Sequence, residues 1–95
     1  MWAIGAALRE KTEVDANYGG WLNNDLADYV VPVNADIGKI EVGFIDKPDP
    51  LINAVGAKGL GEVVMVGASA AIANAIFHAT GKRLREMPIR IEHLL

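Results

Sequence analysis

Residues 56–81 read GAKGLGEVVMVGASAAIANAIFHATG, a glycine-rich loop that leads into a run of small apolar residues. From Gly67 to Thr80 alanine dominates, and apolar side chains occur on every face of the expected helix. Helices that are apolar all round normally lie inside larger proteins. The stretch therefore predicts a buried, alanine-rich helix that begins at about Val64 or Gly67 and ends at Thr80, with Gly81 as its left-handed C-terminal cap.

The chain is too short to surround such a helix by itself. It has 95 residues, of which 52% are hydrophobic, and a domain of this size can build only a thin core. Large exposed apolar patches usually mark interfaces. We therefore expect residues 1–95 to form a single domain, part of whose apolar surface meets something outside the chain.

Composition excludes several classes of protein. The net charge is −3 without any basic block, so nucleic-acid binding is not expected. The absence of cysteine excludes disulfides and thiolate-bound metal or iron–sulfur sites within the chain, and it fits a reducing, cytoplasmic location. The apolar start lacks the positive charge of a signal peptide. Residues 63–79 contain Ser69, Asn74 and His78 and fall short of about 20 residues, so no membrane span is expected.

The segments before the loop predict short elements of both kinds. Apolar residues at positions 1, 4, 5 and 8 share one helical face, which predicts an amphipathic helix over residues 1–11. Residues 15–20 have turn composition and should connect a hairpin of residues 11–14 and 21–23. Apolar and charged residues alternate over residues 39–46, which predicts a strand.

After the helix, residues 89–91 alternate briefly and predict a strand-like tail. The expected fold class is therefore α+β. It combines an N-terminal amphipathic helix, short strands and a hairpin, the glycine-rich loop with its buried helix, and the short C-terminal tail.

Two nucleotide-binding interpretations of the glycine-rich loop fail. A Walker A loop has lysine and then serine or threonine after its second glycine, whereas Glu62 and Val63 follow Gly61 here. A carboxylate at this position would repel the phosphates that the lysine attracts. A dinucleotide-binding fingerprint needs a third glycine where Val64 stands. The loop therefore needs another explanation.

Several short motifs occur in order along the chain. LADYVVP at residues 26–32 and DKPDP at residues 46–50 precede GAKGLGE at residues 56–62. The helix then ends in ATGKR at residues 79–83, followed by the Met-Pro pair at 87–88. This ordered set resembles the C-terminal end of the molybdenum-cofactor-binding subunit of the xanthine dehydrogenase/aldehyde oxidase family, the molybdenum hydroxylases.

The resemblance implies an oxidoreductase that hydroxylates an aldehyde or an N-heterocycle with oxygen derived from water. It implies that Glu62 is the general base, which takes a proton from a water or hydroxide ligand of molybdenum. It further implies that Lys58, Gly59, Leu60 and Gly61 lie close to the molybdenum cofactor (molybdopterin).

The same resemblance implies partners. Residues 1–95 would be the C-terminal part of a larger molybdopterin-binding domain, which works with iron–sulfur and flavin subunits or domains. The family's remaining cofactor ligands lie on other segments, and no metal ligand is expected within this chain. We therefore expect the isolated chain to bind no molybdenum and to be inactive.

Glu62 also has a second interpretation. Its apolar neighbours favour a partly desolvated carboxylate suited to proton transfer, whereas a helix N-terminus stabilises the anion. Glu62 would then only satisfy a helix dipole, in a noncatalytic interaction module or a decayed fragment whose apolar surface docks a partner. Asn74 and His78 share a helix face at a spacing compatible with metal binding, but no third ligand accompanies them, and we expect a polar seam.

Overall fold

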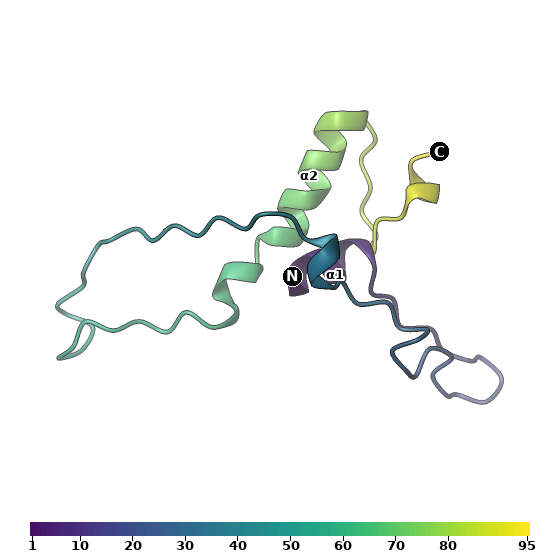
Figure 1. Cartoon of the computed structure of the whole chain (residues 1–95), viewed down its shortest axis with the longest axis horizontal. Coiled ribbons are helices and arrows are strands. Elements are labelled where there is room, and N and C mark those ends of the chain that lie inside the picture. Colours follow the sequence, from purple (N-terminus) through teal and green to yellow (C-terminus); the bar gives the residue numbers. More distant parts are fainter.

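The computed structural model describes all 95 residues, and two helices lie against each other near its centre (Figure 1). Helix α1 spans Trp2–Leu8 and helix α2 spans Ala68–Thr80. The buried residues of α1 are Ala3, Gly5 and Ala7. Because these side chains are small or absent, neighbouring segments can approach the backbone of α1 closely.

The C-terminal tail closes the packing around α1. The N–H of Ile89 donates a hydrogen bond of 2.7 Å to the carbonyl oxygen of Ala7. This carbonyl lies in the last turn of the helix, where carbonyl groups lack partners within the helix. Ile89 is 4% exposed and Ala7 is fully buried. The two ends of the chain are therefore joined at α1.

Helix α1 ends at Leu8, earlier than the predicted Lys11. The N–H groups of Arg9 and Glu10 both donate to the carbonyl of Gly5, at 2.8 and 2.9 Å. Two donors on one acceptor close the last turn instead of extending the helix.

Helix α2 ends at its predicted cap. Gly81 has a φ of +72°, and its N–H donates to the carbonyl of Phe77 at 2.7 Å. This left-handed conformation suits a residue without a Cβ. Beyond the cap, Arg83 folds back over α2, with its guanidinium carbon 3.8 Å from the centre of the Phe77 ring. Its Nη1 donates to Oδ1 of the exposed Asn74 at 2.6 Å.

The predicted hairpin around residues 15–20 is present. Val14 and Trp21 form a single antiparallel bridge across the turn. The side chain of Asn23 reinforces it, because its Oδ1 accepts from the N–H of Glu13 at 2.9 Å. One bridge is a short ladder, so side-chain bonds supply much of the pairing.

The other predicted strands have no partner within the chain. Residues 39–46 are extended, but no segment pairs with them, and no strand is assigned anywhere beyond the single bridge. The tail does not continue as a strand past residue 90, since Ile91–His93 forms a 3₁₀ turn. In that turn the N–H of His93 donates to the carbonyl of Arg90 at 3.1 Å. The α+β arrangement therefore stays a prediction.

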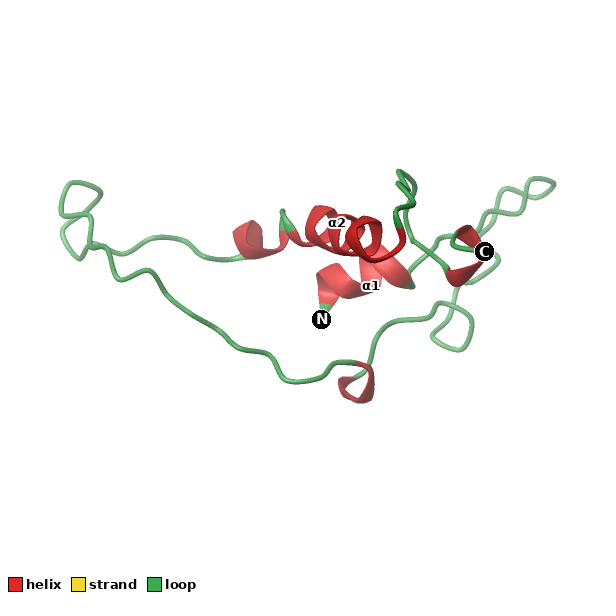
Figure 2. Cartoon of the chain, turned by 90° about the horizontal axis from the view of Figure 1, so that it is seen from above, coloured by secondary structure: helices red, strands yellow, loops and turns green.

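The chain as a whole is much wider than a folded domain of its length. Its radius of gyration is 18.0 Å, whereas a compact domain of this length has one of about 12 Å. Residues 37–61 form an open arm that leaves the helices and returns to α2 (Figure 2). Only five of the 95 residues are buried, and none of them lies in α2. This chain does not supply the burial predicted for α2.

One apolar run is long enough to be compared with a membrane span. Glu62–Thr80 has 19 residues, and an 18-residue window within it has a mean hydropathy of 1.6, which meets the criteria of length and composition that core helices of soluble proteins also meet. The continuous α-helix within it has 13 residues. A helix of that length is about 20 Å long, shorter than the ~30 Å hydrocarbon core of a bilayer.

The close packing around α1 can be tested by adding one methyl group. A Cβ on Gly5 would lie 2.8 Å from Cδ of Pro32 and would also collide with the carboxylate of Glu10. Overpacking costs about 1–3 kcal/mol, against about 1 kcal/mol that alanine gains over glycine in a helix. We expect Gly5→Ala to lower the helical circular-dichroism signal and the Tm.

Gly20→Ala is the matched control for this substitution, because a Cβ at Gly20 would meet no atom within 4 Å. Equal melting curves for the two variants would contradict the close packing described for α1.

Candidate functional site

An open, mostly apolar hollow of about 900 Å³ lies beside the start of α1. Eleven of its fifteen lining residues are hydrophobic, and they come from α1, the arm and the segment that leads into α2. The lining consists of residues 1–4, 40–44, 60–62, 64, 65 and 68. Its two acidic side chains are Glu41 and Glu62. The hollow therefore places the predicted base at the edge of an apolar space.

The two carboxylates differ in their partners. Glu41 is paired with Lys39, whose Nζ lies 2.5 Å from Oε1 of Glu41. Glu62 has no ion pair and no side-chain hydrogen bond within the chain. Glu62 is therefore the carboxylate of the hollow that has no charged partner within the chain.

Glu62 does not lie at the N-terminus of the long helix. It begins the 3₁₀ turn Glu62–Met65, and Val66 and Gly67 separate this turn from α2. The first turn of α2 contains no acidic residue, and no side chain caps it. Because the effect of a helix dipole falls off within about one turn, Glu62 is too far from α2 to interact strongly with its dipole, but it still stands in the first turn of the 3₁₀ helix Glu62–Met65.

The loop before Glu62 is organised by Asn53. The Oδ1 of Asn53 accepts from the N–H groups of Val55 and Ala57, both at 3.1 Å, and its Nδ2 donates to the carbonyl of Ala57 at 2.7 Å. Gly56, between these two residues, has a φ of +64°, which glycine adopts readily. The Asn53 side chain thus forms hydrogen bonds with both the backbone N–H and the backbone carbonyl of Ala57.

Lys58 is directed back across the base of the loop. Its Nζ lies 3.5 Å from Oδ2 of Asp49, and both side chains are about half exposed. This ion pair connects the two ends of residues 49–58, the segment that also contains the turn stabilised by Asn53. Sequence reasoning missed Asn53 and Asp49. The available signal was an asparagine three residues before a glycine, in a stretch of turn-forming residues.

The backbone of Lys58, Gly59, Leu60 and Gly61 is free to bind. None of their four N–H groups donates a hydrogen bond within the chain. A Cβ built on Gly59 or Gly61 would meet nothing within 4 Å, so a bulky group has room to approach this stretch. The predicted cofactor-contacting residues therefore offer a row of unsatisfied donors next to Glu62.

The metal itself would need ligands from elsewhere. No group of three or more His, Asp or Glu side chains in the 95 residues could hold a metal ion, and the chain has no cysteine. The residues present thus fit the organic part of a cofactor, through N–H donors and an open approach, and do not fit the ligation of its metal.

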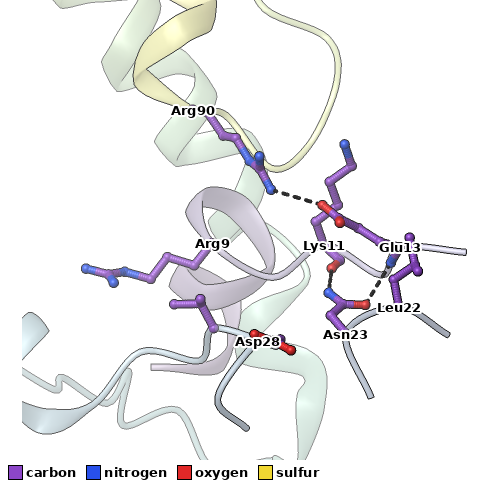
Figure 3. Close-up of a pocket in the computed structure, with 8 residues that line it drawn as sticks. Arg9, Lys11, Glu13, Leu22, Asn23, Asp28 and Arg90 are labelled. Carbon is purple, nitrogen blue, oxygen red and sulfur yellow. Dashed lines mark hydrogen bonds and ion pairs between the residues drawn. The ribbon is translucent and has the colours of Figure 1, made fainter. Parts of the chain in front are cut away.

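A second, polar pocket of about 330 Å³ lies where the hairpin meets the C-terminal tail (Figure 3). Its cationic side chains are Arg9, Lys11 and Arg90. Arg90 reaches Glu13 of the hairpin at 3.9 Å, as Figure 3 shows. On the other side of the pocket, Arg9 pairs with Asp36 at 2.9 Å. With its arginines paired, this pocket serves mainly to connect separate segments of the chain.

Tyr29 makes a further connection near the end of α1. Its hydroxyl donates to Oε2 of Glu10 at 3.2 Å. Partial burial, together with the Glu10 carboxylate, raises the pKa of the Tyr29 hydroxyl above its ordinary value. The hydroxyl therefore stays protonated at neutral pH and keeps its hydrogen bond.

Comparison with known proteins gives a consistent result. No protein-family model matches the chain. The aldehyde oxidoreductase molybdenum-binding subunit PaoC of Escherichia coli K12 is 51% identical over 92 residues, which are 97% of this chain and 13% of that protein. The putative xanthine dehydrogenase molybdenum-binding subunit XdhA of the same strain is 36% identical over 91 residues, 96% of this chain and 12% of that protein.

A third relative is named for another cofactor. The membrane-bound aldehyde dehydrogenase [pyrroloquinoline-quinone] of Gluconacetobacter polyoxogenes is 33% identical over 90 residues, 95% of this chain and 11% of that protein. The three relatives share an oxidoreductase name.

The relatives define the class of protein, because each is named as an oxidoreductase or as a subunit of one. Within this class, the chain belongs to the family of molybdenum-binding subunits of aldehyde oxidoreductases and xanthine dehydrogenases, and it spans 13% of the length of PaoC. The resemblance read from the sequence motifs is thereby confirmed.

The organisation of the loop by Asn53 leads to a prediction for the chain alone. Asn53→Ala removes the acceptor of the Val55 and Ala57 N–H groups. We expect both amides to exchange with deuterium about tenfold faster, because their local protection depends on this side chain. Hydrogen exchange followed by NMR measures the change.

Asn23→Ala is the matched control, because Asn23 makes the corresponding bond to the Glu13 N–H in the hairpin. It should speed exchange at Glu13 and leave Ala57 unchanged. An unaltered Ala57 amide in Asn53→Ala would show that Asn53 does not organise the loop.

Proposed function

We propose that this chain is part of a molybdenum-cofactor oxidoreductase that hydroxylates an aldehyde or an N-heterocycle with oxygen derived from water, and that Glu62 is its general base. The observation that supports this proposal is the unpaired Glu62 carboxylate at the edge of the apolar hollow, directly after a row of free N–H donors. Its membership of the molybdenum-binding family supports the cofactor and the type of reaction.

Glu62 is suited to take a proton because nothing else in the chain neutralises it. A general base must reach the proton that it removes and must not be held in a strong ion pair. Glu41, in the same hollow, has Lys39 beside it, whereas Glu62 has no such partner. Glu62 is exposed at the edge of this open hollow, so a reacting water molecule can reach its carboxylate.

The cofactor would be held partly by the glycine-rich loop. The N–H groups of Lys58, Gly59, Leu60 and Gly61 would donate to its polar atoms, and the two glycines leave room for its approach. The molybdenum cofactor supplies the metal centre and accepts the electrons of the oxidation. The Lys58–Asp49 ion pair and Asn53 keep the loop in the shape that presents these donors.

The partners follow from the size of the chain. Its relatives are several times longer, so the metal ligands, the substrate-facing residues and most of the core belong to the rest of the molybdenum-binding subunit. We place this chain at the C-terminal end of that subunit, in the cytoplasm, with iron–sulfur and flavin subunits or domains as the electron acceptors.

A noncatalytic role is the second candidate, and the exposed apolar surface favours it. Phe44, Ile45 and Leu51 are 77%, 94% and 94% exposed, which suits docking without chemistry. In that case Glu62 would be incidental to the function.

Replacement of Glu62 by glutamine separates the two candidates. In the assembled enzyme, Glu62→Gln keeps the size and polarity of the side chain but removes the proton acceptor. We expect kcat to fall by about 10²–10⁴-fold, while the molybdenum content measured by mass spectrometry stays that of the unmodified enzyme.

Glu41→Gln is the control for this experiment, because it changes the other carboxylate of the same hollow. It should leave kcat within about twofold, since Glu41 is already paired with Lys39. Full turnover in Glu62→Gln would refute the assignment of the base and favour the docking role.

The isolated 95-residue chain provides a separate prediction. Because it offers no cluster of metal ligands, it should retain no molybdenum after incubation with the cofactor and dialysis, and it should show no aldehyde oxidation. The same assays on the assembled enzyme are the positive control. Stoichiometric molybdenum in the isolated chain would contradict the division of ligands proposed above.

A further inference from the structure

The first limb of the arm is an extended segment whose backbone is unsatisfied. No N–H group from Gly38 to Asp46 donates a hydrogen bond, and the only backbone acceptor used is the carbonyl of Ile45, which binds the N–H of Lys47. Folded proteins pair nearly all of their backbone donors and acceptors, and water provides partners only where a segment stays exposed. This limb therefore has a full row of free donors and acceptors.

The side chains of the limb are arranged as in a β-strand. Lys39 and Glu41, two residues apart, form an ion pair on one face. In an extended backbone Ile40, Val42 and Phe44 lie on the opposite face, although the hollow itself is lined by all of residues 40–44, Glu41 included. The alternation in the sequence thus distinguishes an apolar face from a charged face, and the free backbone groups remain at the two edges.

The apolar face of this segment is largely exposed to water, which is unfavourable for large apolar side chains. Ile40, Val42 and Phe44 are 61%, 73% and 77% exposed. Exposed edge strands in folded proteins are usually protected by proline, a bulge or a covering segment. Here the prolines, Pro48 and Pro50, come only after the limb and end it. Within residues 39–45 the charged side chains of Lys39 and Glu41 are the only such device, and no proline or covering segment is present.

We propose that residues 39–45 join, as a β-strand, a sheet whose other strands come from the part of the molybdenum-binding subunit that this chain does not span. The partner is an extended strand with apolar side chains toward the hollow and polar ones toward Lys39 and Glu41. The match covers 13% of PaoC, and the rest of such a subunit provides ample chain for that sheet.

This occupant is preferred to a second copy of the chain for a physical reason. The apolar face of residues 40–44 continues into the hollow and toward α2, none of whose residues is buried. Pairing with a second arm would satisfy one edge and leave α2 in water, whereas a sheet of a larger domain can cover both. The inference rests on the proposed assembly with the rest of the subunit and not on the catalytic role of Glu62.

Hydrogen–deuterium exchange of the assembled enzyme tests the strand directly. Amides of residues 39–45 should exchange about 100-fold more slowly in the assembled subunit than in the isolated chain. The hairpin tip at Tyr18, which is 90% exposed, is the internal control and should change little. Rapid exchange throughout residues 39–45 in the assembled subunit would overturn the proposal.

Two further measurements sharpen this test. Val42→Pro removes one N–H and should lower the yield of assembled subunit at least tenfold, whereas Val42→Thr keeps the N–H and the branched side chain and should assemble. Equal assembly of the two variants would count against pairing.

Protection that appears in the isolated chain only as its concentration rises would assign the strand to a second copy and overturn the proposal. None of these readouts depends on turnover, so they are independent of Glu62→Gln.

Discussion

The rest of the structure depends on the close approach of the C-terminal tail to α1. Ile89 donates to the carbonyl of Ala7, and both residues are almost completely buried. The contact is possible because α1 presents Ala3, Gly5 and Ala7 on the buried side, where larger side chains would hold the tail away. It brings the two ends of a 95-residue chain together while the segment between them extends outward.

This arrangement explains why the chain has a defined site and almost no core. A core needs layers that cover each other, and here one pair of helices and a tail are the only layers in contact. Helix α2 and the arm present apolar side chains that nothing in the chain covers. The local turns, by contrast, are held by short-range bonds such as those of Asn53, so the glycine-rich loop keeps its shape without a surrounding domain.

The charged side chains are distributed unevenly between the polar pocket and the apolar hollow. Arg9, Arg90 and Glu13 connect segments that are distant in sequence, and they lie around the polar pocket near the tail. Around the hollow, charge is sparse: Glu41 is paired, and Glu62 is left alone. Glu62 is exposed, and an unpaired, accessible carboxylate is a useful feature for proton transfer.

The sequence by itself determined the features that depend on neighbouring residues. The end of α2 at Gly81, the turn at residues 15–20 and the family resemblance of the loop before Glu62 could all be read from local patterns. Only the tertiary structure decided that Glu62 shares a hollow with residues 40–44, that it stands apart from α2, and that Asn53 organises the loop. Local patterns encode turns and caps because these bonds span a few residues, whereas a shared cavity or an absent strand partner depends on segments far apart in the chain.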